Sequence, residues 1–558
     1  MMAITAMTFG RRMSRGLIPA TCLLFAGTVG AQDRPSEQAA DHSAHHAEPA
    51  SEKAVPSASA EALRTDGKAV APKAAEAPEP TKLLEGYGNG GFTVTTKVPE
   101  AQAFFSNGMT LGWAFAHHAA IAAMRESTRL DPECAMCLWG LAYVSGPTLN
   151  YGKDAGERVE LLAMARKAQG LAIKAGTDYE RAMTHALVAR YRPGKVEKRD
   201  AEFAADIAAL VTRYPQDDTL GVMAADTTLV ATSEESDWKP AGEKAMAFLE
   251  PVLARTPNST SAIHFYIHAA ETAVASAKAE PYADRLADLA PAASHLMHMP
   301  SHTWYWVGRY QNAADTNLRA VVIDKANAAR LGHEGHAGVF DLPYHAHNVI
   351  FGLGGALMSG DSRGALSLAR PLIEVAQDKD AAPPFMQLLS AAGYFGLARF
   401  DDPASVLALK EPKLPYLKAA WHYARGEAFA YQKDAAGIKA EMEAIPAKIA
   451  SGKIDEETRA PEQLLGITRA VLKGRLAVLE GRLPDAVTAF REGAAIEETE
   501  DFQRFADPPA FWYPVRRDVA ATLLASGDKA GAVTEAEASL ELRPKDPVAL
   551  QILAAAKE

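Results

Sequence analysis

Histidine is the residue type through which this chain could most readily do chemistry. Nine of the sixteen histidines in its 558 residues fall between His264 and His347. In the segment HFYIHAAE, His264, His268 and Glu271 follow one another at i, i+4 and i+7, which places them on one face of a helix. Imidazole and carboxylate groups gathered on one face are suitable ligands for zinc or copper.

A second group of histidines repeats this pattern further along the chain. The segment HLMHMPSH contains His295, His298 and His302 at i, i+3 and i+7, and Pro300 must kink or end that helix. His298 and His302 each follow a histidine of the first group by 34 residues. If 34 residues make one repeat, these positions are neighbours on helices about 8 to 10 Å apart, and their side chains can reach one ion.

We therefore predict a transition-metal site for copper or zinc. Its candidate ligands are His264, His268, Glu271, His295, His298, His302, His333, His336, His345 and His347. Two other interpretations remain open. Neutral imidazoles are ordinary hydrogen-bonding groups, so these residues could be buried and satisfied by backbone carbonyls, or they could bind a peptide carboxylate or aromatic group.

Cys134-Ala-Met-Cys137 is a second candidate site, either a disulfide or a redox pair. It follows Asp131-Pro132 at the predicted start of a helix, where the macrodipole and free N–H groups lower a thiol pKa. No strand precedes it and no second Cys-x-x-Cys pair accompanies it, which argues against a thioredoxin-like motif or a structural zinc site. In an oxidising exterior compartment a local disulfide is the default expectation.

The elements that must position these residues are helices. After Leu83, apolar residues recur at i, i+3, i+4 and i+7, and no stretch shows sustained alternation, so we predict an all-α fold. A Gly-x-x-x-x-Ala turn signal returns at Gly308, Gly360, Gly481 and Gly527. With Ala101 as position 1 of a 34-residue unit, small residues occupy positions 8 and 20 and a proline occupies position 32. The sequence thus resembles the tetratricopeptide-repeat (TPR) family, although the match is weak between 170 and 259.

This resemblance implies an α-solenoid of helical hairpins with a concave groove. In the family, positions 2, 5 and 9 line that groove, and His295, His298 and His302 take these positions when Gly308 is position 15. Tyr305, at position 12, is a predicted groove contact. The next recognisable repeat begins after an insertion of 18 residues, whose His333 and His336 we expect to lie on a mobile loop that folds over the groove.

The chain divides into three predicted parts. Residues 1–31 match a secretory signal peptide, with arginines before an apolar run from Leu17 to Val29 and cleavage after Ala31. Residues 32–84 form a predicted disordered leader rich in Ala, Pro and Glu, and residues 85–558 form the solenoid, whose histidine-rich part is 260–360. The apolar run is too short to span a membrane, and the net charge of -11 disfavours nucleic acid as the main partner.

Three segments also look like a group of exported Gram-negative bacterial TPR proteins. They are LDPECAMCLWGLAYVSGPTLNY, HFYIHAAE with HLMHMPSH, and PYHAHN. This resemblance implies a periplasmic or secreted protein and leaves its activity open.

We predict an exported solenoid that acts by binding, with copper or zinc in a histidine-lined groove. One alternative is a scaffold that binds a peptide or an unknown periplasmic protein in the same groove. Another is a metal-dependent hydrolase or oxidase in which Glu271 or Glu334 serves as general base. We assign no catalytic residue, because repeat arrays mostly bind and no substrate-pocket motif is present.

Overall fold

The computed structural model describes residues 82–232, 238–333, 335–503 and 508–558, and these residues contain helices and no strand. The first half contains α3 (Pro99–Trp113), α4 (His117–Leu130), α5 (Ala135–Val144), α6 (Ala155–Ala175), α7 (Asp178–Tyr191), α8 (Val196–Arg213), α9 (Asp218–Val230), α10 (Trp238–Arg255), α11 (Thr260–Thr272), η2 (Ser276–Ala279), α12 (Glu280–Leu289), α13 (Ser294–His298) and α14 (Pro300–Trp306). The second half contains α15 (Tyr310–Arg330), α16 (Gly335–Val339), α17 (His345–Ser359), α18 (Ser362–Ala376), α19 (Pro384–Phe400), α20 (Pro403–Leu407), α21 (Pro415–Gln432), α22 (Ala435–Ala444), α23 (Glu456–Leu479), α24 (Leu483–Glu497), α25 (Glu500–Gln503), α26 (Arg516–Ser526), α27 (Lys529–Leu542) and α28 (Pro547–Lys557).

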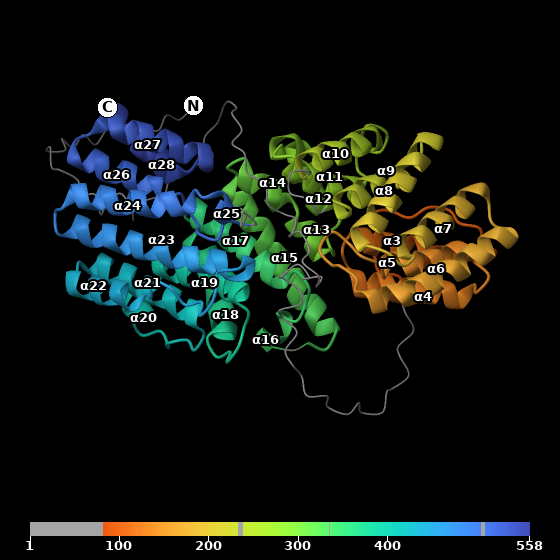
Figure 1. The fold of residues 1–558 in the computed structure, drawn as a ribbon, viewed down its shortest axis with the longest axis horizontal. Helices are drawn as coiled ribbons and strands as arrows, with labels where there is room; N and C mark the ends of the chain where they lie inside the picture. The colour runs from red at the N-terminus through yellow and green to blue at the C-terminus, as the bar shows by residue number, and fades with distance from the viewer. Residues whose placement is uncertain (1–81, 233–237, 334, 504–507) are drawn as a thin grey trace, which may run out of the picture.

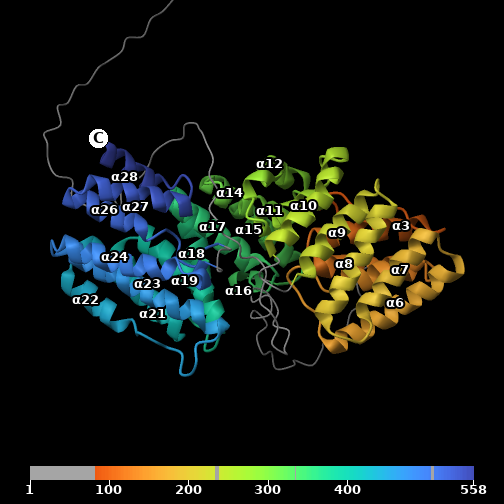
Figure 2. The same ribbon diagram turned by 45° about the horizontal axis from the view of Figure 1, so that its top comes forward.

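The helices stack as consecutive hairpins, so that most of them pack against the next helix and many also against the one after it. Figures 1 and 2 show this progression from α3 at one end of the molecule to α28 at the other, with α13 to α17 between the two halves. The fold is an all-α solenoid of tetratricopeptide-type hairpins, as the sequence predicted. Helices α6 to α10 continue the stack through the region where the repeat pattern was weak.

Local sequence explains where the helices begin and how closely they approach. Asp154 and Thr177 each form a capping box with a glutamate three residues later, which fixes the starts of α6 and α7. At Gly355 in α17, an added Cβ would lie 2.8 Å from backbone atoms of α15, so these two helices can pack backbone to backbone only because this residue is glycine. Small residues at crossing points therefore set the spacing of the stack.

Two hydrophobic cores meet at the histidine-rich helices. One is built almost entirely from residues between Tyr87 and Trp304, and the other from residues between Tyr305 and Ala556. Hydrogen bonds between segments far apart in the sequence also brace each half. Asn89 bonds the start of α11 through Thr260, and Tyr310 donates to the carbonyl of Pro544 near the C-terminus. Helices α13 and α14 therefore lie at the junction of two separately braced halves.

The predicted signal peptide and almost all of the predicted leader lie outside the described residues. At the start of the described residues, the backbone N–H of Leu84 donates to Oδ1 of Asn107 in α3 at 3.1 Å. In the part of the chain that the structure describes, no helix has the length and hydrophobicity of a membrane span.

Candidate metal centre

Six of the predicted histidines form two compact sets. Set 1 consists of His264, His268 and His295, and set 2 consists of His298, His302 and His347. Within each set the nitrogen atoms available as ligands all lie within 4.8 Å of one another. All six side chains are buried except that of His347, which is half-buried.

The repeat builds the same arrangement twice. In each set, a pair of histidines four residues apart comes from one repeat and the third comes from the next repeat. Set 1 takes its pair from α11 and its third member from α13, whereas set 2 takes its pair from α13 and α14 and its third member from α17. The third members are 52 residues apart, which is one repeat of 34 plus the insertion of 18.

Pro300 shapes set 2. The helix is divided there into α13, which ends at His298, and α14, which begins at Pro300. Met299 between them keeps helical dihedral angles, so His298 and His302 still lie one turn apart, and their Nε2 atoms are 2.8 Å from each other. The Nε2 atom of His347 approaches that of His302 at 3.4 Å.

Hydrogen bonds to the opposite ring nitrogens fix the tautomers of set 2. The amide of Asn317 donates its Nδ2 proton to the carbonyl of Ala313 at 2.7 Å, so its Oδ1 faces Nδ1 of His298 at 2.7 Å and must accept a proton from it. Nδ1 of His302 donates to the carboxylate of Glu271 at 2.8 Å. In the neutral form of both rings, each imidazole carries one N–H, and the two Nε2 atoms then present lone pairs toward each other.

In set 1, a hydrogen bond likewise fixes the tautomer of His264. Nδ1 of His264 donates to the backbone carbonyl of Trp113 at 2.7 Å, which leaves Nε2 as a lone-pair donor. That Nε2 atom lies 3.1 Å from Nε2 of His268 and 3.1 Å from Nε2 of His295. One lone pair thus faces two further ring nitrogens.

Burial keeps His264 and His295 neutral. The pKa of His264 falls to about 3, mainly because the ring is buried; the hydrogen bond to Trp113 opposes the shift, and neighbouring His302 and His117 add to it. Burial, followed by the neighbouring histidines, also lowers the pKa of His295 well below its usual value. Metal binding requires unprotonated imidazole, and the environment supplies that form at neutral pH.

Glu271 lies one layer outside the two sets. We predicted it as a ligand, but one of its oxygens accepts from His302 and the other accepts from the indole N–H of Trp306 at 3.1 Å. A carboxylate on the far nitrogen of an imidazole orients the ring and increases its basicity. The structure therefore assigns Glu271 to positioning rather than direct ligation.

Aromatic rings enclose each set. Phe115 packs on set 1, with its ring centroid 4.6 Å from that of His264 and 4.8 Å from that of His295. Phe351 packs on His302 of set 2 at 4.3 Å. Tyr344 approaches His295 at 4.5 Å, and both Phe115 and Tyr344 hold positive φ angles of 56° and 69°. Bulky residues adopt this conformation at a cost, so tertiary packing holds these two rings against the histidines.

Two other predicted histidines, His345 and His333, do not join the sets. Nδ1 of His345 donates to Asp324 at 2.9 Å, a buried contact that joins α17 to α15, and His345 belongs to neither set, so its role as a ligand stays a prediction. His333 is exposed and lies 3.5 Å from Asp341, away from both sets. The side chain of His336 lies outside the described residues. The insertion does reach the site, but through Tyr344 rather than through His333.

The remaining predicted site residues, Tyr305, Cys134 and Cys137, stabilise the fold and lie outside both sets. Tyr305 is fully buried in the second core against Tyr310 and Phe351, so it is not an open groove contact as predicted. Its helix turns position 12 toward the packed interior. Cys134 and Cys137 are joined by a disulfide at the start of α5, with their Cα atoms 5.3 Å apart.

Sequence reasoning missed several residues that shape the centre. Asn317 and the carbonyl of Trp113 lock tautomers, and Phe115 and Tyr344 cover set 1. A buried asparagine on the apolar face of a predicted helix was the signal that could have identified Asn317. The other three contacts join segments more than 100 residues apart or depend on unusual backbone angles, and the sequence carries no local signal for them.

The spacing of the nitrogens fits a metal ion. Three nitrogens bound at about 2.0 Å in a tetrahedral arrangement lie about 3.3 Å from one another. Two Nε2 separations in each set, both 3.1 Å in set 1 and 2.8 and 3.4 Å in set 2, bracket this value, and the third pair of ligand nitrogens lies within 4.8 Å. Each set would leave one coordination position for water or another ligand, as in three-histidine zinc sites.

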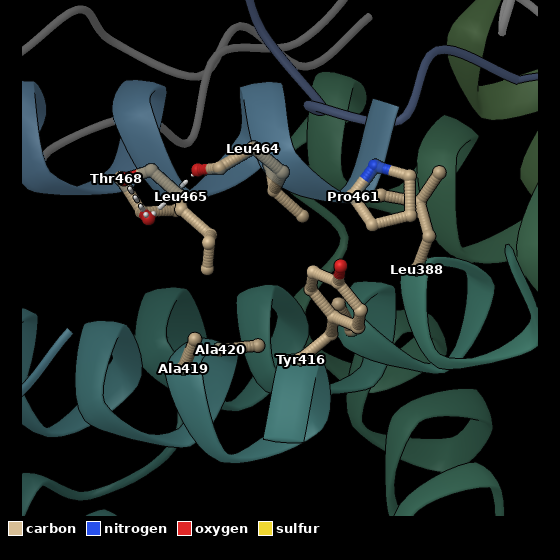
Figure 3. Close-up of a pocket in the computed structure, with 9 residues that line it drawn as sticks. Leu388, Tyr416, Ala419, Ala420, Pro461, Leu464, Leu465 and Thr468 are labelled. Atoms are coloured by element: carbon tan, nitrogen blue, oxygen red, sulfur yellow. Dashed lines mark hydrogen bonds between the residues drawn. The ribbon is translucent and has the colours of Figure 1, made fainter. Parts of the chain in front are cut away.

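Two recesses differ in their relation to this centre. Figure 3 shows an apolar pocket between α19, α21 and α23, where the hydroxyl of Thr468 is satisfied by the carbonyl of Leu464; it carries no chemistry. A second recess of about 390 Å3, open solvent included, is lined by Trp113 and Phe115 and therefore adjoins set 1. It also contains Asp226, whose pKa burial raises to about 6.

Comparison with known proteins yields structural likeness only. No family model and no curated protein matches the chain. Similar solved structures include the Cut9–Hcn1 hetero-tetramer of the APC/C, with 12% identity over 82% of this chain and 76% of that chain and a TM-score of 0.30. Yeast Tom70 is 10% identical over 82% of this chain and 88% of that chain, with a TM-score of 0.27. The human IFIT1 dimer with m7Gppp-AAAA is 10% identical over 80% of this chain and 91% of that chain, with a TM-score of 0.28.

At such identities and TM-scores, these likenesses carry no argument about what this chain binds. The coordinates themselves define its class, a tetratricopeptide-type α-solenoid with two three-histidine sets at the junction of its halves.

Proposed function

We propose that the protein binds a transition-metal ion, copper or zinc, through the histidines of sets 1 and 2. The observation that carries this proposal is the contact between Nε2 of His298 and Nε2 of His302 at 2.8 Å, with both opposite nitrogens committed as donors. Two lone pairs at this distance repel each other unless a cation lies between them. A third nitrogen from His347 converges on the same place, which suits a metal ion better than a proton.

The donor set favours copper or zinc over harder ions. All six candidate ligands are imidazoles, whereas magnesium and calcium require oxygen ligands. For divalent ions at nitrogen sites, affinity is highest for copper. Zinc accepts the same three-histidine geometry, so the two ions are distinguished by measurement.

Elemental analysis of the purified full-length protein tests the proposal. We expect about one or more equivalents of copper or zinc after loading and desalting, and loss of metal when His298→Ala and His302→Ala are combined. The matched control changes His185 and His422, which lie on α7 and α21 outside both sets. Circular dichroism verifies that each variant is folded. A protein that binds neither ion after loading, or a control variant that loses metal equally, refutes the proposal.

A second candidate function is that of a scaffold for a protein partner. The solenoid architecture supports it, because stacked hairpins commonly present an extended binding surface. Cut9 is described in a hetero-tetramer with Hcn1, which is a property of that protein. If a partner is captured from periplasmic extract equally well with and without a chelator, the result supports this role. If capture requires bound metal, the histidine centre takes part in binding the partner.

We also propose that the protein is exported to the periplasm or secreted. Support comes from the signal-like sequence of residues 1–31 and from the disulfide between Cys134 and Cys137, a bond typical of oxidising compartments. Fractionation of cells that express the full chain, together with N-terminal sequencing of the product, tests this. A product that retains residue 1 and stays in the cytoplasm contradicts it.

A further inference from the structure

The two histidine sets lie side by side rather than in separate parts of the protein. The rings of His268 and His302, which are equivalent residues of consecutive repeats, have centroids 5.8 Å apart. The rings of His295 and His298, one from each set, have centroids 5.7 Å apart. Because the repeat relates the sets, the separation of equivalent rings approximates the separation of the two places where ions would bind.

We infer that sets 1 and 2 form one two-ion centre, with two ions about 6 Å apart that take a small anion between them. This inference rests on the proposed function. It adds that two ions bind, that they lie close enough to interact, and that they accept a small anion as a ligand. Each set supplies three nitrogens and leaves a coordination position, and the sets adjoin at the edges formed by His268 with His302 and His295 with His298.

Charge explains why an anion completes the centre. Two cupric ions bring four positive charges into a largely buried site whose six candidate ligands are all imidazoles, with no carboxylate among them. The carboxylate of Glu271 offsets one of these charges through His302. A small oxygen or nitrogen anion at the open positions offsets more charge and completes both coordination shells.

The surroundings limit the size of that anion. Phe115 packs on all three rings of set 1, and Phe351 packs on all three rings of set 2. Tyr344 adds a third ring over His295. A triatomic anion such as azide, with one terminal nitrogen on each ion, can span about 6 Å within such an enclosure. A single hydroxide oxygen bound about 2 Å from one ion does not reach the other, and a bulky substrate does not fit.

Copper loading with spectroscopic detection tests this inference. The full-length apoprotein is titrated with Cu2+, and paramagnetic resonance spectra are recorded at one and at two equivalents. We expect two equivalents to bind and the spectrum to broaden as the second enters, because two Cu2+ ions at this distance interact through their magnetic dipoles. Two equivalents with the spectrum of isolated ions, or saturation at one, overturn the inference while leaving metal binding intact. Binding of no copper refutes the proposed function itself.

Single-set variants sharpen the test. His295→Asn removes a ligand from set 1, and His347→Asn removes one from the half-buried position of set 2. Each variant should bind one equivalent fewer and show the unbroadened spectrum. Azide should bind at least tenfold more tightly to the two-copper protein than to either variant. Equal azide affinity in all three overturns the assignment of the anion to the space between the ions. If a variant does not fold, the wild-type titration decides the question alone.

Discussion

The hydrogen bond from His298 to Asn317 provides the sharpest test of how the centre works. Asn317 is fully buried on α15, touches no ion itself, and fixes the proton on Nδ1 of His298. Replacement of Asn317 by Leu keeps an apolar side chain of similar size and removes the acceptor. His298 is then free to carry its proton on Nε2 and donate it to His302, which satisfies both rings without metal and blocks one ligand position.

The expected loss of metal affinity in Asn317→Leu follows from two energies. Loss of a partner on the far side of a metal-bound histidine typically costs 10- to 100-fold in metal affinity, or about 1.4 to 2.7 kcal/mol. A buried Nδ1–H without an acceptor would cost about 1 to 3 kcal/mol, which drives the tautomer change. We therefore expect Asn317→Leu to weaken metal binding by about 10- to 100-fold, while the apoprotein loses less stability than a buried amide deletion normally causes.

Competition with a chelator of known affinity measures the first effect, and thermal unfolding of the apoprotein measures the second. The matched control is Gln387→Leu, which removes another buried amide with two hydrogen bonds, on α19 away from the histidines. It should lower stability and leave metal affinity unchanged. Metal affinity of Asn317→Leu within threefold of the wild type would show that the tautomer of His298 does not control the site.

Three further predictions concern stability. Burial raises the pKa of Glu497 to about 8, so between pH 4.5 and 8 the folded state keeps a proton that the unfolded state releases, and stability falls as pH rises. At pH 8 the free energy of unfolding of Glu497→Gln should therefore exceed that of the wild type by on the order of 4 kcal/mol, with a higher melting temperature. Near pH 5 the two free energies should be almost equal, and a difference that does not change with pH would contradict this. Replacing Cys134 and Cys137 together by Ser opens a short loop and should cost about 2 kcal/mol in chemical denaturation, with reductant no longer affecting the variant. Gly355→Ala should cost about 1 to 3 kcal/mol, because its methyl group meets the backbone of α15, and unchanged denaturation would contradict that contact.

Much of the fold could be predicted from local patterns. The apolar spacing predicted helices, and the recurring glycine and alanine positions predicted hairpins, because each hairpin repeats the same short-range packing. The pairing of His264 with His268 and of His298 with His302 also followed from helical geometry. By contrast, Glu271 shares the helix face of His264 and His268 yet bonds the back of a ligand ring, because its oxygens reach the next repeat.

Two positions show what spacing alone does not decide. His345 belongs to the same segment as His347, but its Nδ1 bonds Asp324 and it is in neither set, and Tyr305 occupies a position of the repeat that here points into the core. Sequence spacing tells which residues share a face. It does not tell which neighbouring element that face meets once an insertion of 18 residues has shifted the next helix.

The sequence by itself determined the helical repeat and the placement of two histidine pairs one repeat apart, since both depend on contacts within about 34 residues. Only the tertiary structure decided which third histidine completes each set, which nitrogen of a ring faces the centre, and which rings enclose it. Those features depend on contacts such as His264 with Trp113, which lie 151 residues apart and form only when the whole solenoid is folded.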